Sequence, residues 1–201
     1  MPDFSYPAVM GSAQSGDFTS VPDEMIPIPE VTFGSVTNRV AQVNLEGGSY
    51  FMRKAFLLNR LVLRINGLAG APTGKILIYQ APEGEAGITN LVGSFSSFAV
   101  PGIGNLVLVP DQGNIYIKAG LIFILIGRDS ALGSFTYPCW DPPFADLIAA
   151  NVDPDTHPVY FTTLIAASAP NAPTFNPRQS PGGSAFGTFT SVMPVVRFKR
   201  L

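Results

Sequence analysis

The sequence contains very few of the residues that ordinarily carry catalysis or bind metals. It has one cysteine, one histidine and one tryptophan among 201 residues. A single cysteine excludes an internal disulfide framework, and one cysteine with one histidine cannot complete a structural zinc shell. Charge is also scarce, because 13% of the residues are charged, about half the usual share. These shortages favour a protein that acts through its surfaces and shape.

Long apolar runs are missing as well. The longest, residues 121–126, is far shorter than the roughly 20 residues that span a bilayer. A net charge of −2 argues against a general nucleic-acid binder. Because a lone domain needs charge to stay dispersed, we expect the apolar surface to be covered by other protein. An ordinary β domain that happens to be low in charge is the alternative.

Glycine and proline, by contrast, are abundant, and they separate short apolar segments. In residues 60–66, three apolar residues alternate with Arg60, Val62 and Arg64, which is the period of a half-buried strand. Residues 67–74 then supply a turn before a second strand at 75–80. Further strands are expected at 40–45, 50–57, 90–100, 106–109, 115–118, 121–128, 159–166 and 188–199, with breaks at 47–48, 82–84, 110–113 and 119–120. The pattern predicts an all-β fold, an antiparallel, jelly-roll-like β-sandwich.

The chain is expected to divide into an extended arm at residues 1–35 and a β-sandwich domain at residues 36–201. Prolines exclude a long helix in the arm, yet its apolar residues are too frequent for a solvated linker. Such an arm either lies in a groove of a partner or packs on its own domain. One short helical insertion is expected at 144–150, after a possible N-cap at Asp141. Residues 168–187 form a second segment rich in proline and glycine.

Candidate chemical sites are weak. Asp153, Asp155 and His157 would share one face of an extended chain, as in a metal site, but a polar loop between two prolines is the simpler interpretation. Cys139 could pair with His157 as a nucleophile, although its apolar neighbours favour a packed thiol. The glycines at 102 and 104 precede a strand, not a helix, and the acids at 83 and 85 lie on a turn. We therefore predict no catalytic residue, no metal and no cofactor.

Charge is unevenly distributed along the chain. Residues 1–38 contain five acids and no base, whereas the last five residues contain three bases and no acid. Oppositely charged ends can meet between neighbouring subunits, and solvated tails are the alternative. Arg53, Lys54, Arg60 and Arg64 form the main basic cluster, either a solvated sheet face or a site for anionic sugars or a neighbour's acidic arm. The residues expected to contact partners are Phe4, Tyr6, Phe18, Ile26, Ile28, Arg60, Arg64, Arg197 and Arg200.

Two stretches carry a resemblance to a known group of proteins. They are "LVLRINGLAGAPTGKILIYQAPEG" at 61–84 and "LVLVPDQGNIYIKAGLIFILIG" at 106–127, followed by the closing strand at 194–198. This order resembles a β-sandwich domain that recurs in virion proteins of tailed bacteriophages. The arm and the insertion near residues 140–155 lie outside the pattern.

The resemblance implies a non-enzymatic structural protein, a minor or decorating capsid protein or a neck or tail component. Such a protein would form a homo-oligomer, for example a trimer, bind other virion proteins but neither nucleic acid nor membrane, and be located in the virion after assembly in the host cytoplasm. The alternative is a carbohydrate- or receptor-binding module that takes a host glycan. Its candidate aromatic platforms are Tyr79, Tyr116, Tyr137 and Trp140, for which core packing is the simpler role.

Overall fold

The computed structural model of the chain describes residues 24–25, 28–29, 35–81, 89–130, 132–141, 160–175 and 193–200. Within these ranges all regular structure is strand, and every strand pair is antiparallel. The expected all-β class is therefore confirmed, with the layered character of a β-sandwich. The expected helix at 144–150 lies outside these residues, as does most of the arm. No described helix is long and apolar enough to cross a membrane.

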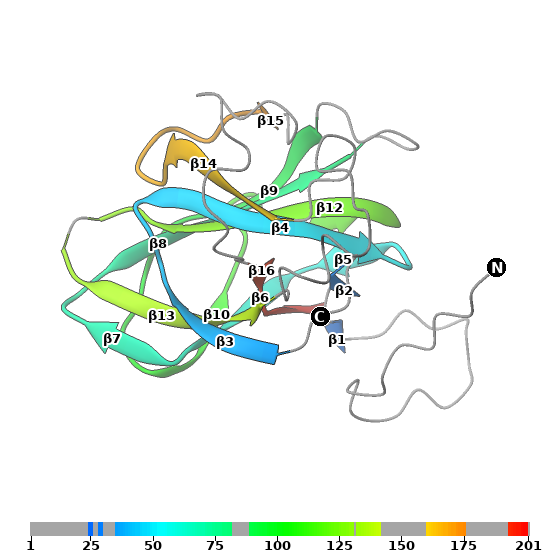
Figure 1. Ribbon diagram of the computed structural model, residues 1–201. Helices are drawn as coiled ribbons and strands as arrows, with labels where there is room; N and C mark the ends of the chain where they lie inside the picture. The colour runs from blue at the N-terminus through cyan, green and yellow to red at the C-terminus, as the bar shows by residue number, and fades with distance from the viewer. Residues whose placement is uncertain are drawn as a thin grey trace, which may run out of the picture.

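The upper layer is a seven-stranded sheet that runs across the top of Figure 1. Its order is β14-β4-β12-β8-β9-β15, and β2 pairs with β4 beyond the end of β14. The strands are β2 (Ile28–Pro29), β4 (Asn44–Met52), β8 (Thr73–Gln80), β9 (Thr89–Ala99), β12 (Gly120–Arg128), β14 (Tyr160–Ala166) and β15 (Thr174–Phe175).

The lower layer contains two four-stranded sheets. The first has the order β1-β17-β6-β10, and the second has β13 paired with β16, β3 and β7. Their strands are β1 (Glu24–Met25), β3 (Ser35–Val40), β6 (Arg60–Ile65), β7 (Gly67–Ala69), β10 (Gly104–Leu108), β13 (Ser134–Asp141), β16 (Met193–Pro194) and β17 (Val196–Lys199). The chain passes directly from β6 into β7, and the Asn66 backbone N–H donates to the carbonyl of Thr136, 2.9 Å away. This passage links the two lower sheets. A small pair, β5 (Phe56–Leu58) with β11 (Ile115–Ile117), completes the fold.

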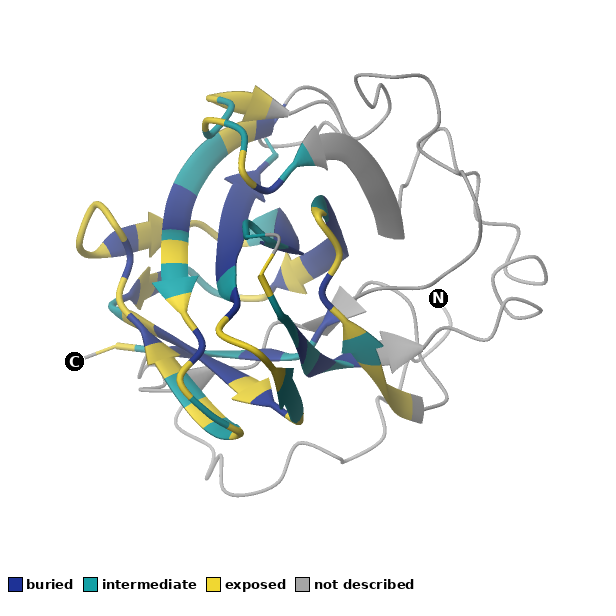
Figure 2. Cartoon of the chain, turned by 90° about the vertical axis from the view of Figure 1, so that its left-hand side faces the viewer, coloured by how far each residue is buried: buried dark blue, intermediate teal, exposed yellow. Residues whose placement is uncertain are grey.

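The main core lies between the two layers, where Figure 2 shows the buried positions gathered. Ile76, Ile78 and Ile124 contribute from the upper sheet, and Leu61 and Leu63 from the lower one. The alternation predicted for β6 is thus confirmed for its inward residues. Because β6 and β8 belong to different layers, the loop between them is a sandwich crossover and not a hairpin.

The outer face of the upper sheet is also buried. Leu45, Leu77, Phe123 and Leu125 form a second apolar cluster there, so β8 and β12 are covered on both faces. Residues 167–173 connect β14 at one edge of this sheet to β15 at the other. Two hydrogen bonds hold this strap down: the Tyr79 hydroxyl donates to Ala172 O at 2.9 Å, and Lys75 Nζ donates to Ala169 O at 2.6 Å.

The sequence-based segmentation is wrong in several places. The strand expected at 40–45 is interrupted at residues 41–43, between β3 and β4, and the strand expected at 50–57 is interrupted at residues 53–55, between β4 and β5. The glycines at 47–48 do not end a strand but lie inside β4, which runs unbroken from Asn44 to Met52. Part of the predicted turn at 67–74 forms β7, which pairs with β13. Asp141 is the last residue of β13, which the sequence analysis did not predict.

Candidate functional site

The basic residues singled out in the sequence meet on the outer face of the lower layer. Arg60 and Arg64 lie on β6, and the neighbouring strand β17 adds Arg197 and Lys199. The register places Lys199 opposite Arg60, and Arg197 opposite Val62. Leu61 and Leu63 point into the core between them, so strand alternation turns the four cations outward. We call these four residues, with Val62 and Val107, the basic face.

The two arginines of β6 are exposed, and about 13 Å of strand separates them. No carboxylate in the described part of the chain lies within ion-pair distance of either one. Val62 lies between them and is only 3% exposed although it belongs to neither core cluster. Long arginine stems commonly pack over such an apolar residue while the charged end stays in water. The face can therefore offer both charge and apolar contact to an anionic partner.

The acidic arm reaches this face at one point. Strand β1 pairs with β17, so that Glu24 stands opposite Lys199 and Met25 opposite Phe198. The oppositely charged ends of the sequence therefore meet within one chain here, through backbone pairing. Ile28, expected to contact a partner, is likewise in a strand, β2, opposite Phe51 of β4. The described part of the arm thus packs on its own domain.

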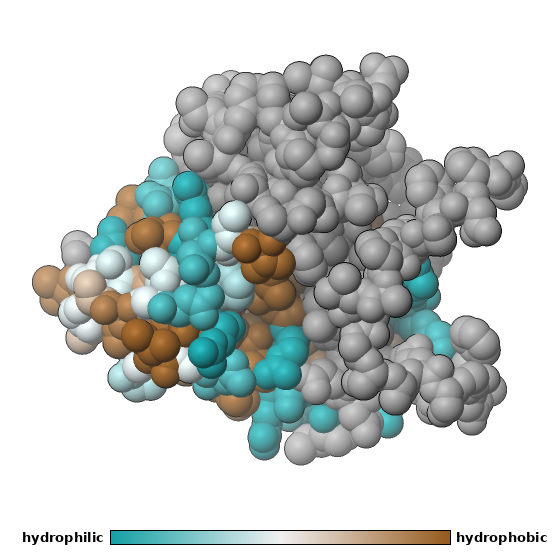
Figure 3. Space-filling view, turned by 60° about the horizontal axis from the view of Figure 1, so that its bottom comes forward, coloured by the Kyte–Doolittle hydropathy of each residue, from teal (hydrophilic) through white to brown (hydrophobic). Residues whose placement is uncertain are grey.

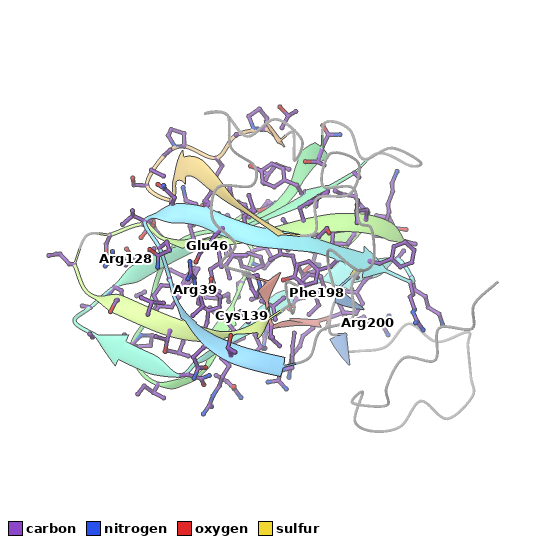
Figure 4. The ribbon with its side chains drawn as sticks, viewed as in Figure 1. Arg39, Glu46, Arg128, Cys139, Phe198 and Arg200 are labelled. Atoms are coloured by element: carbon purple, nitrogen blue, oxygen red, sulfur yellow. The ribbon has the colours of Figure 1, made fainter. Side chains whose placement is uncertain are left out.

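Other predicted contact residues are not brought to the basic face. Arg53 and Lys54 lie in the bend after β4, outside the lower sheets. Arg200 directly follows β17 and is exposed, and Figure 4 shows it near the C-terminal end of the chain. Phe4, Tyr6, Phe18 and Ile26 lie outside the described residues.

A buried ion pair was not foreseen from the sequence. Figure 4 shows Arg39 of β3 and Glu46 of β4 facing each other between the two layers. Arg39 Nε donates to Glu46 Oε1 at 3.2 Å and Nη2 donates to Oε2 at 2.9 Å, a bidentate arrangement. The Tyr137 hydroxyl also donates to Glu46 Oε1, at 3.3 Å. The Glu46 side chain is wholly buried, whereas that of Arg39 is 26% exposed.

Burial dominates the electrostatics of this pair. Desolvation raises the pKa of Glu46 above its ordinary value, although the hydrogen bond and the charge of Arg39 act in the opposite direction. The same hydrogen bond raises the pKa of Arg39. Burial holds the pKa of Tyr137 well above its ordinary value. Two strands of different layers are therefore joined by a satisfied polar contact, which suits a structural role better than catalysis.

The remaining chemical candidates fall in two groups. Cys139 is buried in the core with Thr37 Oγ1 3.4 Å from its sulfur, as expected of a packed thiol. In the described ranges, no group of three or more His, Cys, Asp or Glu side chains could hold a metal. Asp153, Asp155, His157 and the acids at 83 and 85 lie outside those ranges. The glycine at 102 forms a bend that leads into β10, as predicted.

The aromatic platforms proposed for sugar binding are mostly internal. Tyr79 and Tyr137 are buried, the second within the main core, so neither can stack on a sugar at the surface. Tyr116 is exposed on β11, opposite the exposed Leu57 of β5. The side chain of Trp140 lies outside the described part. One exposed tyrosine does not make an extended aromatic platform.

Neither a protein-family model nor a curated protein matches the sequence. The functional argument therefore depends on the surfaces described above.

Proposed function

We propose that this chain is a non-enzymatic structural subunit that assembles with copies of itself and with other proteins of a tailed-bacteriophage-type virion. In such a particle it would serve as a decorating capsid protein or as a neck or tail component. The resemblance of residues 61–84 and 106–127 to phage β-sandwich domains motivates the virion setting. The observation that carries the assembly role is the edge strand β10.

Strand β10 has the properties of an edge that another chain covers. Among the described strands it is hydrogen-bonded only to β6. Its outward residue Val107 is 52% exposed, and Val109 and Ile103, which flank the strand, are 63% and 65% exposed. Natural proteins usually protect an open edge with charge, proline or a bulge, because an open apolar edge invites pairing with another chain. In the described part of the chain β10 itself contains no charge, proline or bulge, and such an apolar edge supports docking of a second polypeptide.

The opposite edge of the lower layer has a similar character. Strand β3 pairs only with β13 in the described part, and its residues Val36 and Val40 are about half exposed. Figure 3 shows brown apolar residues beside teal polar ones across the described part of this layer's outer surface. Two apolar edges that the described strands leave unpaired would allow each subunit to contact two neighbours, as rings and lattices require.

The assembly role is tested on the full chain by size-exclusion chromatography with light scattering. We expect a mass of two or more subunits, and we expect Val107→Lys to reduce it because a buried charge opposes edge docking. Leu132→Lys is the matched control, since Leu132 is exposed in a loop away from the β10 edge. A monomer at all concentrations, or equal effects of the two variants, contradicts the assembly role.

The virion setting needs a separate experiment. Antibodies raised against the full chain are applied to particles purified from lysates of cells that carry the gene, and the particles are examined by electron microscopy. Labelling at one regular position on the particle is expected. Intact particles that contain none of this chain by mass spectrometry contradict the virion setting but leave the assembly role standing.

A further inference from the structure

We infer that the β10 edge of one subunit pairs with the β3 edge of a second copy, as antiparallel strands that continue the lower layer from subunit to subunit. The inference rests on the proposed assembly role and names the two surfaces that meet. Three observations carry it: the matching side chains of the two edges, the directions of the two strands, and the position of the basic face.

The two edges carry the same pattern of outward side chains. Each has an exposed asparagine at its centre and an exposed apolar residue two positions to either side. The sets are Ile103, Asn105 and Val107 on the β10 edge, and Val36, Asn38 and Val40 on the β3 edge. Antiparallel pairing that places Asn38 opposite Asn105 also places an apolar residue opposite an apolar residue on both sides. Apolar side chains directly opposite one another stabilise a pair of strands.

The two asparagines can satisfy each other across this contact. Within one subunit, Asn66 Nδ2 donates to Asn38 Oδ1 at 2.6 Å, so the Nδ2 group of Asn38 remains as a donor. The side chain of Asn105 makes no hydrogen bond in the part of the chain that the structure describes. In the inferred pairing, Asn38 Nδ2 donates to Asn105 Oδ1 of the neighbour. Because an amide covered without a hydrogen bond costs free energy, the two asparagines specify the register.

Strand direction favours the same pair of edges. Strand β10 runs antiparallel to β6, and β13 runs antiparallel to β7, which continues β6 along the chain. Strand β3 runs antiparallel to β13, so it has the direction of β6 and the opposite direction to β10. Two copies side by side in the same orientation therefore present β10 and β3 as antiparallel strands, the arrangement of every described strand pair.

The basic face favours unlike edges over like ones. Arg64 lies opposite Asn105 in register, one strand in from the β10 edge, and Arg60 lies on the same strand. Two β10 edges paired with each other would place both basic faces on one surface, where like charges repel. Next to the β3 edge, the outward residues Thr136 and Pro138 of β13 are uncharged. A head-to-tail contact therefore keeps the basic faces of neighbouring copies apart, and it builds a ring where the rotation closes.

The contact is tested by mixing two edge variants of the full chain and measuring mass by size-exclusion chromatography with light scattering. Val36→Lys blocks the β3 edge and Val107→Lys blocks the β10 edge, so each variant alone is expected to associate more weakly than the wild type, by about tenfold or more. An equal mixture is expected to form dimers, because the intact β10 edge of the first variant meets the intact β3 edge of the second.

Two controls make this mixing experiment decisive. Leu132→Lys, which is exposed and lies on neither edge, is expected to assemble like the wild type. Recovery of association in the mixture excludes misfolding of the two edge variants. Val36→Lys that assembles like the wild type, or a mixture that stays as monomeric as its components, overturns the inference.

Cysteine cross-linking gives an independent readout of the register. Chains with Asn38→Cys and 15N-labelled chains with Asn105→Cys are oxidised separately and as a mixture, and the wild type, whose Cys139 is buried, gives the background. A disulfide between positions 38 and 105 of different chains is expected in the mixture. Its absence from an assembled mixture overturns the inference, as does a disulfide that joins position 105 of two chains, the product of two like β10 edges.

The outcomes separate the two proposals. An assembly that Val107→Lys weakens but Val36→Lys does not contradicts the β10–β3 contact and leaves the assembly role in place. A wild-type chain that remains monomeric at all concentrations contradicts the assembly role itself.

Discussion

At the scale of single residues, Glu46 is the most constrained position that the structure describes. It lies wholly buried and holds its charge only because Arg39 and Tyr137 donate three hydrogen bonds to it. Taking a carboxylate out of water costs several kcal/mol unless the partners are well placed. Breaking the pair is therefore expected to cost more free energy than the intact pair contributes to stability. It holds β3 to β4 mainly because an unpaired buried charge is so unfavourable.

Replacing Arg39 alone is predicted to destabilise the fold much more than replacing Arg39 and Glu46 together. Arg39→Met leaves a buried carboxylate unpaired and should lower the free energy of unfolding by about 3 kcal/mol, the lower end for buried pairs because Arg39 is partly exposed. The double variant Arg39→Met with Glu46→Leu should recover most of that loss. Urea denaturation of both variants checks this. A double variant that is less stable than Arg39→Met alone contradicts it.

The raised pKa of Glu46 predicts a pH effect with a definite sign. Because the pKa is higher in the folded protein than in the unfolded chain, the folded state binds this proton more tightly. Lowering the pH through that pKa should therefore increase the stability of the wild type relative to Glu46→Gln, whose amide does not titrate. Denaturation curves of both proteins at several pH values isolate the difference. A relative stability that falls with falling pH would show that Arg39 outweighs desolvation.

Prediction at the residue level succeeded for the alternating positions of β6 and failed for the buried ion pair. The inward positions of β6 follow from alternation, since burial of every second residue is a local pattern. Arg39 and Glu46 lie in polar sequence, and nothing local indicates that one faces the other. Their contact depends on how β3 crosses β4, which is a property of the layers.

At the scale of elements, β4 shows why glycine is not always a break. A Cβ on Gly47 would lie 1.9 Å from the backbone oxygen of Ile124 on the neighbouring strand β12. Only glycine lets the two backbones approach so closely. Gly47 is thus required for packing inside a strand, although a pair of glycines in a sequence ordinarily indicates a turn.

Gly47→Ala is accordingly predicted to destabilise the fold by about 3 kcal/mol, because the clash involves backbone of two central strands that cannot move apart cheaply. Gly102→Ala is the matched control, since a Cβ there meets nothing within 4 Å. Thermal unfolding of the two variants should separate them clearly. Equal melting temperatures would contradict the assigned role of Gly47.

Elements with strong apolar patterns were predicted well. Strands β9 and β12 begin within one residue of the expected positions, because long runs of branched and aromatic residues favour strand wherever they occur. Strands β3 and β13 were missed. β3 is polar, and β13 contains Pro138, which lacks a backbone N–H but whose carbonyl accepts from Val195 at 3.0 Å. Tertiary pairing stabilises both strands where local preference does not.

At the scale of the whole molecule, apolar surface is covered on some faces and open on others. The strap at residues 167–173 crosses the upper sheet, whereas no other described strand pairs with the outer edge of β3 or β10 in the lower layer. The few charges in the sequence thus leave apolar edges on the lower layer. Four of the cations gather on one basic face. In the proposed assembly, the apolar edges would supply an apolar contact and the basic face an ionic one.

These two contributions are predicted to respond differently to salt. Raising sodium chloride from about 0.05 to 0.5 M should weaken association of the wild type, because surface attraction is screened beyond a few ångströms at high ionic strength. Arg64→Glu, which lacks the attraction, should respond less or in the opposite direction, while apolar docking is little affected. Light scattering over a concentration series measures both. Wild-type association that does not change with salt contradicts an ionic contribution.

The sequence alone determined the all-β class, the positions of the most apolar strands and the clustering of cations on β6, because alternation and composition act locally. Tertiary structure decided which layer each strand joins, which added Arg197 and Lys199 to Arg60 and Arg64 through register. It also placed Arg39 against Glu46 and turned a pair of glycines into strand. These contacts depend on how strands cross and pair between the layers, and local alternation and composition do not contain that geometry.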